Sequence, residues 1–155
     1  MVVFMKYIIK KATMNNIKKA NELLTKLIID EKKYDSNINE KCVVREFYEK
    51  IINDDNSCIY FAIVNQNIVG YIYGFIQNNG DSCIDMVAQL DAMYVDIDYR
   101  KLGIGNALIN EFEKWAKQKG AKYIELKVCN RNNEAISLYH KNNFHEVKTI
   151  MKSNL

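Results

Sequence analysis

Runs of apolar residues alternate between two periods along the chain, and these periods predict the order of its elements. Six short apolar runs bounded by polar turns are typical of strands: residues 4–10, 58–64, 68–77, 87–95, 123–128 and 144–151. Four segments repeat apolar residues at helical spacing: 17–28, 44–51, 102–118 and 132–142. The predicted order is β-α-α-β-β-β-α-β-α-β. This order indicates one mixed α/β domain over residues 1–155, with helices on both faces of the sheet.

Local signals support several boundaries between these elements. Thr13 is placed to cap the first helix, because a threonine side chain accepts hydrogen bonds from the first free N–H groups. The short polar turn 65–67 predicts a hairpin between two strands. Gly120 predicts the end of the helix that starts near Leu102, since glycine adopts the left-handed conformation found there.

Composition excludes several classes of protein. The chain has 155 residues, 48% of them hydrophobic and 26% charged, which is typical of a soluble globular domain with a real core. A net charge of +3 suits an anionic ligand but is too small for a nucleic-acid binder. We expect no membrane span, because no apolar stretch reaches 18 residues, and no signal peptide. Absent proline, with heavy use of Asn, Ile and Lys, indicates an AT-rich, bacterial source.

The cysteines and histidines favour a reducing compartment. Four cysteines lie far apart and form no C-x-x-C pair, and only two histidines are present. Such a set does not predict a metal site, and buried reduced thiols fit a cytoplasmic protein.

Residues 93–108 carry the clearest chemical signal. A strand-like run ends in a polar turn with Arg100 and Lys101, followed by Gly103, Gly105 and an amphipathic helical pattern. A helix N-terminus presents unpaired N–H groups and a partial positive charge, and glycines let a ligand approach them closely. The segment therefore predicts a phosphate or pyrophosphate site. It is neither a P-loop, since G-x-x-x-x-G-K-[ST] is missing, nor a dinucleotide-binding turn, whose third glycine is a leucine here.

Two motifs together resemble the GNAT superfamily of N-acetyltransferases. Val95-x-x-x-x-Arg100-x-x-Gly103-x-Gly105 is similar to the acyl-CoA pyrophosphate loop of that family. Asn132-x-x-Ala135-x-x-Leu138-Tyr139-x-x-x-Asn143-Phe144 is similar to the family's N-x-x-A-x-x-L-Y-x-x-x-G-F. Three positions depart from the pattern: Ile97 stands where proline is frequent, and Lys101 and Asn143 stand where glycine is frequent. Asparagine tolerates the left-handed conformation that its position needs.

The resemblance implies a site for acetyl-CoA as acyl donor, with no metal. Backbone N–H groups of the loop would hold the pyrophosphate, helped by the side chains of Arg100 and Lys101. These N–H groups belong to Leu102, Gly103, Ile104, Gly105 and Asn106. The backbone of Met93, Tyr94 and Val95 would pair with the pantetheine arm as an added strand does, and would polarise the thioester carbonyl. Asn132 would either cap its helix or touch the cofactor.

The resemblance also implies the catalytic roles. Tyr139 would protonate the departing CoA thiolate, since a phenol is an effective acid for this step. The base that deprotonates the amine is open: Asp91 acting through water comes first, and Glu125 second. We expect direct attack in a ternary complex, because no cysteine and histidine form a recognisable nucleophile pair. His140 follows Tyr139 on the helix and is expected to face elsewhere.

The resemblance implies that the acceptor is a primary amine of a small molecule, a peptide N-terminus or a lysine. We expect the two N-terminal helices and the loop around residues 34–39 to form its pocket. Acidic residues at positions 30, 31, 35, 81 and 85 give a weak indication of a cationic amine. The alternative is a non-catalytic acyl-CoA-binding or sensing module on the same fold, or, less favoured, a phosphate or nucleotide binder unrelated to CoA. The family also implies a homodimer.

Overall fold

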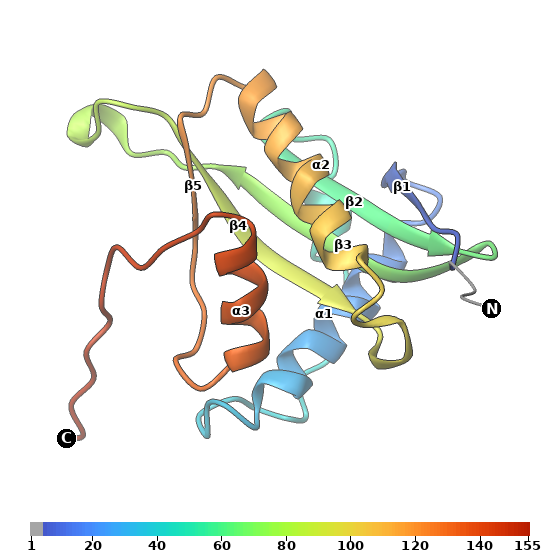
Figure 1. The fold of residues 1–155 in the computed structure, drawn as a ribbon, viewed down its shortest axis with the longest axis horizontal. Coiled ribbons are helices and arrows are strands. Elements are labelled where there is room, and N and C mark those ends of the chain that lie inside the picture. Colours follow the sequence, from blue (N-terminus) through green and yellow to red (C-terminus); the bar gives the residue numbers. More distant parts are fainter. Residues whose placement is uncertain (1–4) are drawn as a thin grey trace.

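A five-stranded sheet forms the centre of the computed structural model, which describes residues 5–155 (Figure 1). Helices α1, α2 and α3 flank it, and three short 3-10 turns (Tyr48–Lys50, Gly80–Ser82, Ile97–Tyr99) lie in the connections. The elements in chain order are β1 (Ile8–Lys11), α1 (Lys18–Glu31), β2 (Ser57–Val64), β3 (Asn67–Ile76), β4 (Val87–Val95), α2 (Ile104–Gln118), β5 (Tyr123–Leu126) and α3 (Asn133–Lys141).

The order of strands across the sheet, β1-β2-β3-β4-β5, follows the chain. The first four strands pair antiparallel, and β5 pairs parallel to β4 after the α2 crossover. Strands β2 and β3 form the predicted hairpin. Asn65 and Gln66 in its turn have φ angles of 46° and 69°, because a tight hairpin turn needs positive φ at its two central residues.

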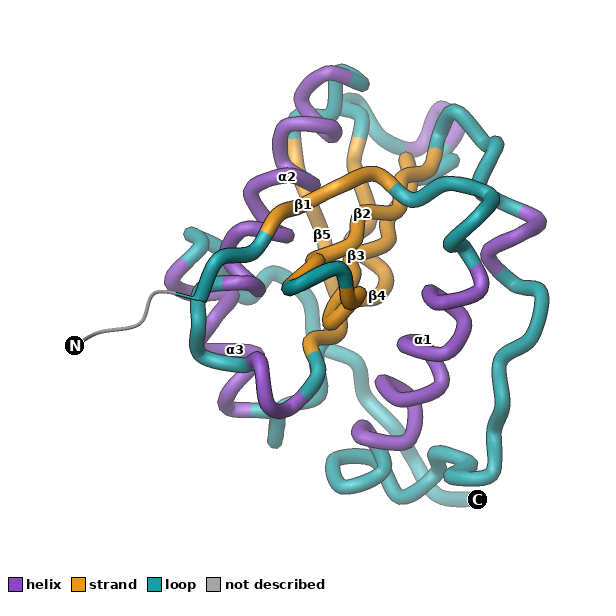
Figure 2. The backbone as a smooth tube through the Cα atoms, turned by 90° about the vertical axis from the view of Figure 1, so that its right-hand side faces the viewer, coloured by secondary structure: helices purple, strands orange, loops and turns teal. Residues whose placement is uncertain are grey.

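Each face of the sheet is buried under helices, as predicted. Figure 2 shows the sheet edge-on, with α1 on one side and α2 on the other. On the α1 side, Ala20 and Leu23 pack against Phe61 and Tyr71, and the Tyr71 hydroxyl lies 3.0 Å from that of Tyr48. On the α2 side, a separate cluster includes Ile72, Leu108 and Phe112. Burial on both faces explains why β2 and β3 read as continuous apolar runs.

Several predicted boundaries are confirmed. Strand β4 spans the expected residues 87–95, and Gly120 follows α2 with a φ angle of 87°. Asn143, which follows α3, has a φ angle of 64°. The first predicted strand begins at Phe4, which lies outside the described residues, and β1 begins at Ile8.

The prediction of a second N-terminal helix over residues 44–51 is wrong. This segment is irregular except for the 3-10 turn Tyr48–Lys50, and Glu46 has a φ angle of 50°. Side chains of α1 replace the helical hydrogen bonds. Thr25 accepts from the Val44 N–H at 2.9 Å, and Asn21 accepts from the Tyr48 N–H at 3.1 Å. The apolar spacing is real, but it serves packing against α1 rather than a helix.

Thr13 does not cap α1. The Thr13 N–H donates to the Asn16 side chain at 2.8 Å, and a turn separates both residues from the helix. The helix begins after Ile17, which provides no side-chain cap. The Asn16 side chain, by binding the backbone of Thr13, favours this turn and delays the helix.

The prediction of a last strand over residues 144–151 is also wrong. Residues 144–155 have no regular secondary structure, and Figure 1 shows them running away from α3. Lys148 lies 3.2 Å from Glu125 on β5, but no backbone ladder follows this contact, and Val147, Ile150 and Met151 are exposed. Alternating apolar residues favour a strand only where a sheet edge pairs with them.

Candidate active site

The sheet opens between β4 and β5. Strand β4 pairs with β3 over nearly its whole length, but with β5 only over residues 87–90. From Asp91 to Val95, the side of β4 that faces away from β3 therefore has no β-ladder partner among the described residues. Such an edge can accept an added extended chain through backbone hydrogen bonds.

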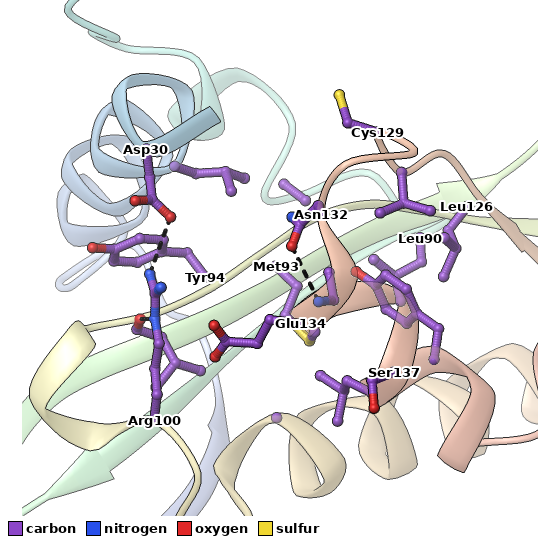
Figure 3. A pocket seen from close by; sticks show the side chains of 18 of the residues that line it. Asp30, Leu90, Met93, Tyr94, Arg100, Leu126, Cys129, Asn132, Glu134 and Ser137 are labelled. Atoms are coloured by element: carbon purple, nitrogen blue, oxygen red, sulfur yellow. Dashed lines mark hydrogen bonds and ion pairs between the residues drawn. The ribbon is translucent and has the colours of Figure 1, made fainter. Parts of the chain in front are cut away.

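A cavity of about 770 Å³ lies at this opening. Its walls are β4 from Leu90 to Val95, the end of α1, the N-terminus of α2, residues 126–129 after β5, and α3. Figure 3 shows Asp30 and Arg100 on one side of the cavity, and Asn132 and Glu134 across it. Its size suits a small organic ligand. Arg131 donates to the carbonyl oxygen of Tyr34, so the loops after α1 and before α3 also touch.

The loop before α2 has the shape that an anion site needs. Gly103 has a φ angle of 85° and stands at the N-cap of α2, where no side chain satisfies the first N–H groups. Lys101 has a φ angle of 60°, so it keeps the conformation of the glycine common at this position in the resembled family. The N–H groups at this helix start are therefore free to bind an anion.

Arg100 is turned toward β4 and α1. Its Nε donates to the Val95 carbonyl at 2.8 Å, and its terminal nitrogen lies 3.3 Å from the Asp30 carboxylate. The guanidinium also lies 5.2 Å from the centre of the Tyr94 ring. Arg100 thus holds the loop against β4. Lys101 is exposed, so its charge is accessible at the loop surface.

Helix α3 packs closely on the start of α2. A Cβ added at Gly105 would come within 3.1 Å of the Leu138 side chain, so a glycine is needed for this approach. The Asn142 side chain donates to that of Asn106 at 2.7 Å. These two contacts fix α3, and with it Tyr139, relative to the anion-binding loop.

Tyr139 and Asn132 both line the cavity. The Asn132 side chain accepts from the Ala135 N–H at 3.1 Å, so the helix-capping alternative is correct. Burial, with a smaller contribution from the negative charge of Glu31, raises the pKa of Tyr139 to about 12. A tyrosine with this pKa stays protonated at neutral pH and can donate its proton.

Asp91 is the extra residue of a β-bulge. The register between β3 and β4 shifts where Tyr73 pairs with Ala92 and Gly74 with Leu90, which leaves Asp91 unpaired. A bulge re-aims the side chain it carries. Asp91 lines the cavity, and desolvation raises its pKa while Lys127 lowers it.

The structure gathers most of the predicted site residues in one cavity. Met93, Tyr94, Val95, Arg100, Lys101, Gly103, Gly105, Asn106, Asn132, Asp91 and Tyr139 all line it. Leu102 and Ile104 do not: Leu102 is partly exposed, and the Ile104 side chain is buried in the core. Glu125, the second candidate base, lies outside and binds Lys148 and Gln77. His140 is exposed and pairs with Glu146, as expected.

The sequence identifies one carboxylate of the cavity, Glu31, only as a member of a scattered set of acids, without a predicted place in the site. Glu31, the last residue of α1, lines the cavity. Burial raises its pKa, and the charges of Asp30 and Asp35 raise it further. Its position in a run of helix-ending polar residues gives no sequence signal for this role. No group of three or more His, Cys, Asp or Glu within residues 5–155 forms a candidate metal site, and no helix in that range is long and apolar enough to cross a membrane.

Comparison with known proteins places the chain among acetyltransferases. The acetyltransferase (GNAT) family profile matches residues 24–144. A Methanocaldococcus jannaschii protein described as an uncharacterized N-acetyltransferase is 30% identical over 146 residues, which is 93% of this chain and 63% of that protein. The chain thus spans less than two thirds of that relative.

Solved structures share the fold over nearly the whole chain. A mutant of a Bacillus halodurans protein aligns with a TM-score of 0.83 at 19% identity, covering 96% of this chain and 99% of that one. The aminoglycoside N-acetyltransferase AAC(6')-Iy in complex with CoA aligns with a TM-score of 0.75 at 15% identity, covering 97% and 95%.

Proposed function

Because the chain belongs to the GNAT acetyltransferase family, we propose that it transfers an acetyl group from acetyl-CoA to a primary amine. The amine attacks the thioester directly while both substrates are bound. One observation carries the proposal: the open edge of β4, the N-terminus of α2 and Tyr139 line one cavity. In this proposal, the anionic end, the extended arm and the thioester of the donor bind to these three features.

The donor lies along the backbone in this proposal. The pyrophosphate binds the free N–H groups from Leu102 to Asn106, with Lys101 adding positive charge at the surface. The pantetheine arm pairs with Met93 to Val95 as an added strand. An N–H of this segment polarises the thioester carbonyl. Arg100 contributes by holding the loop in shape, and Asn132 by capping α3.

The reaction needs an acid for the thiolate and a base for the amine. Tyr139 protonates the CoA thiolate as it leaves, and its raised pKa of about 12 keeps the proton available at neutral pH. Asp91 is the first predicted base, acting through water. The neighbour AAC(6')-Iy, described as an aminoglycoside N-acetyltransferase in complex with CoA, is consistent with this donor and with a small cationic amine as acceptor.

Release of free thiol tests the proposal. The protein is incubated with acetyl-CoA and a panel of polyamines, aminoglycosides, amino acids and peptides, and CoA thiol is followed with a chromogenic disulfide. We expect turnover with at least one cationic amine. Acetyl-CoA binding without turnover on any amine would favour the acyl-CoA-sensing alternative, and absence of CoA binding would contradict both. The cytoplasmic location, the bacterial source and the homodimer stay predictions.

A further inference from the structure

Glu31 lies on the α1 side of the cavity, and its carboxylate has no hydrogen-bond or cationic partner within residues 5–155. It closes α1, is half-buried, and lines the cavity. Its pKa is raised by burial and by the charges of Asp30 and Asp35, with no contribution from a hydrogen bond or a cation. A half-buried carboxylate without a cationic partner is unfavourable, so a cation that arrives with the substrate would stabilise Glu31.

Glu31 on α1 and Tyr139 on α3 line the same cavity. Burial raises the pKa of the Tyr139 hydroxyl, and the charge of Glu31 contributes to this rise. No hydrogen bond within residues 5–155 engages that hydroxyl. The same Glu31 charge also raises the pKa of Tyr71 on β3. An unpartnered phenol and an unpartnered carboxylate thus face one cavity from α3 and α1.

The other carboxylates of the cavity are less suited to meet a cation there. Asp30 is held by Lys33 at 3.0 Å and Arg100 at 3.3 Å. Asp91 is exposed, and desolvation raises its pKa, but unlike Glu31 it has a cation, Lys127, whose charge acts on it. Glu134 is exposed on the first turn of α3. The remaining charged groups that line the cavity, Lys101 and Lys141, are cations.

We propose that Glu31 binds the ammonium group of the acceptor opposite Tyr139 and takes the proton that the amine must lose before it attacks. This inference rests on the proposed acetyl transfer and assigns its acceptor side. Glu31 removes one proton from the ammonium group, and the neutral nitrogen forms a bond to the acetyl carbon. As the carbon–sulfur bond breaks, Tyr139 gives its proton to the thiolate and regains one from the nitrogen. The products are the amide, CoA thiol and one proton, which Glu31 releases to solvent.

The proposal assigns a substrate class as well as a residue. The acceptor enters as a small cationic amine, because the carboxylate site favours the ammonium form and a primary amine with a pKa near 10 is mostly protonated at neutral pH. A neutral nucleophile, such as an alcohol, would leave the negative charge of the half-buried Glu31 carboxylate without a cationic partner.

The test compares Glu31→Gln with two matched acid-to-amide variants. Asp91→Asn changes the other candidate base, and Asp81→Asn changes an exposed carboxylate outside the cavity. Thiol release is measured with 1,4-diaminobutane and acetyl-CoA from near pH 7 to near pH 10. We expect Glu31→Gln to lower kcat/KM for the amine about a hundredfold near pH 7, with the affinity for acetyl-CoA unchanged. Asp81→Asn should behave as the wild type.

The pH profile separates proton transfer from a structural role. Near pH 10 much of the amine is already neutral and needs no base, so the deficit of Glu31→Gln should shrink to within about tenfold. A deficit of equal size at both pH values, or none at all, would overturn the proposal. So would a pH-dependent deficit that follows Asp91→Asn instead.

A second measurement applies if the wild type releases no thiol. The thermal stability of the CoA-saturated protein is then recorded against added 1,4-diaminobutane. We expect the amine to raise Tm in the wild type and in Asp81→Asn, but not in Glu31→Gln. In that case the catalytic proposal fails while the acceptor site at Glu31 stands. No shift in the wild type, or an equal shift in Glu31→Gln, would contradict the site itself.

Discussion

The proposed donor and acceptor sides of the cavity differ in the groups that form them. The donor side consists of backbone: the free N–H groups at the start of α2 and the open edge of β4. The acceptor side consists of side chains from distant parts of the chain, above all Glu31 on α1, Asp91 on β4 and Tyr139 on α3. A backbone site requires a turn of fixed shape, whereas a side-chain site requires only that particular groups meet.

This difference predicts that substitutions on the two sides affect different measurements. A donor held by N–H groups places few demands on residue type, provided that Gly103 and Lys101 keep their positive φ angles. An acceptor held by carboxylates depends on each side chain. Changes on the donor side should therefore alter acetyl-CoA affinity, and changes on the acceptor side should alter turnover of the amine.

The sharpest probe of the donor side is Asn106→Asp. An acidic residue in the first turn of α2 is favourable for the helix, and Asp still accepts the hydrogen bond from Asn142. It also places a negative charge beside the proposed pyrophosphate. We expect acetyl-CoA to bind about thirtyfold more weakly, a loss of about 2 kcal/mol. Calorimetric titration measures this, and unaltered affinity would remove the α2 N-terminus from the donor site.

Tyr139→Phe probes the acceptor side. Without the phenolic proton the thiolate leaves unprotonated, so we expect kcat to fall at least about tenfold with little change in acetyl-CoA affinity. The wild-type rate should also show no decline from ionisation of Tyr139 below about pH 10, because the pKa of this group is raised to about 12. Steady-state kinetics measure both. An unchanged kcat would take Tyr139 out of the mechanism.

Asn132→Ala distinguishes a structural role from a donor contact. The side chain caps α3 through the Ala135 N–H, so its loss should lower the free energy of unfolding by about 1 kcal/mol. Denaturant titration measures this change. If the affinity for acetyl-CoA stays within about twofold, Asn132 acts only as a cap. A larger loss of affinity would assign it to both.

Glu31→Gln should stabilise the fold while it weakens the reaction. The pKa of Glu31 is raised in the folded protein, so its carboxylate is penalised at every pH above that pKa, and the penalty vanishes below the pKa of the unfolded chain. We expect Tm to rise on the order of 1 °C near pH 7 and to match the wild type near pH 3. Calorimetry at both pH values checks this. A lower Tm near pH 7 would mean that Glu31 has a stabilising partner.

Lys101→Gly should have the smallest effect. Glycine relieves the positive φ angle of 60°, so stability should rise by less than about 1 kcal/mol. The lost charge should weaken acetyl-CoA binding only about twofold at physiological salt. Thermal unfolding and titration measure the pair of changes. A decrease in stability would mean that the Lys101 side chain makes contacts that stabilise the fold.

The sequence predicted the fold well where strands that are adjacent in the chain also pair with each other. Strands β2, β3 and β4 lie next to one another in the chain and in the sheet, so their apolar runs sufficed. The helical spacing from Val44 to Ile51 gave a wrong prediction, because backbone N–H groups of this segment donate to the side chains of Thr25 and Asn21 on α1 instead of to helical carbonyls. The prediction of a last strand over residues 144–151 was wrong because no strand edge pairs with this segment.

The candidate site shows the same limit. The donor loop could be predicted because Gly103, Gly105 and the following helix are contiguous in sequence. The brace formed by Arg100 and Asp30 could not, since 70 residues separate its partners. Glu31 was noticed only as one of several scattered acids, because burial and the approach of Tyr139 exist only in the folded chain.

The separation of β4 from β5 after residue 90 affects the stability of the protein without ligand. Backbone groups from Asp91 to Val95 lie at an edge that no strand within residues 5–155 completes. An extended ligand that pairs there acts as a missing strand, so its binding energy becomes folding energy. At a concentration a hundred times its Kd, such a ligand adds about 2.7 kcal/mol of stability. The abundance of the folded protein then follows the supply of its donor.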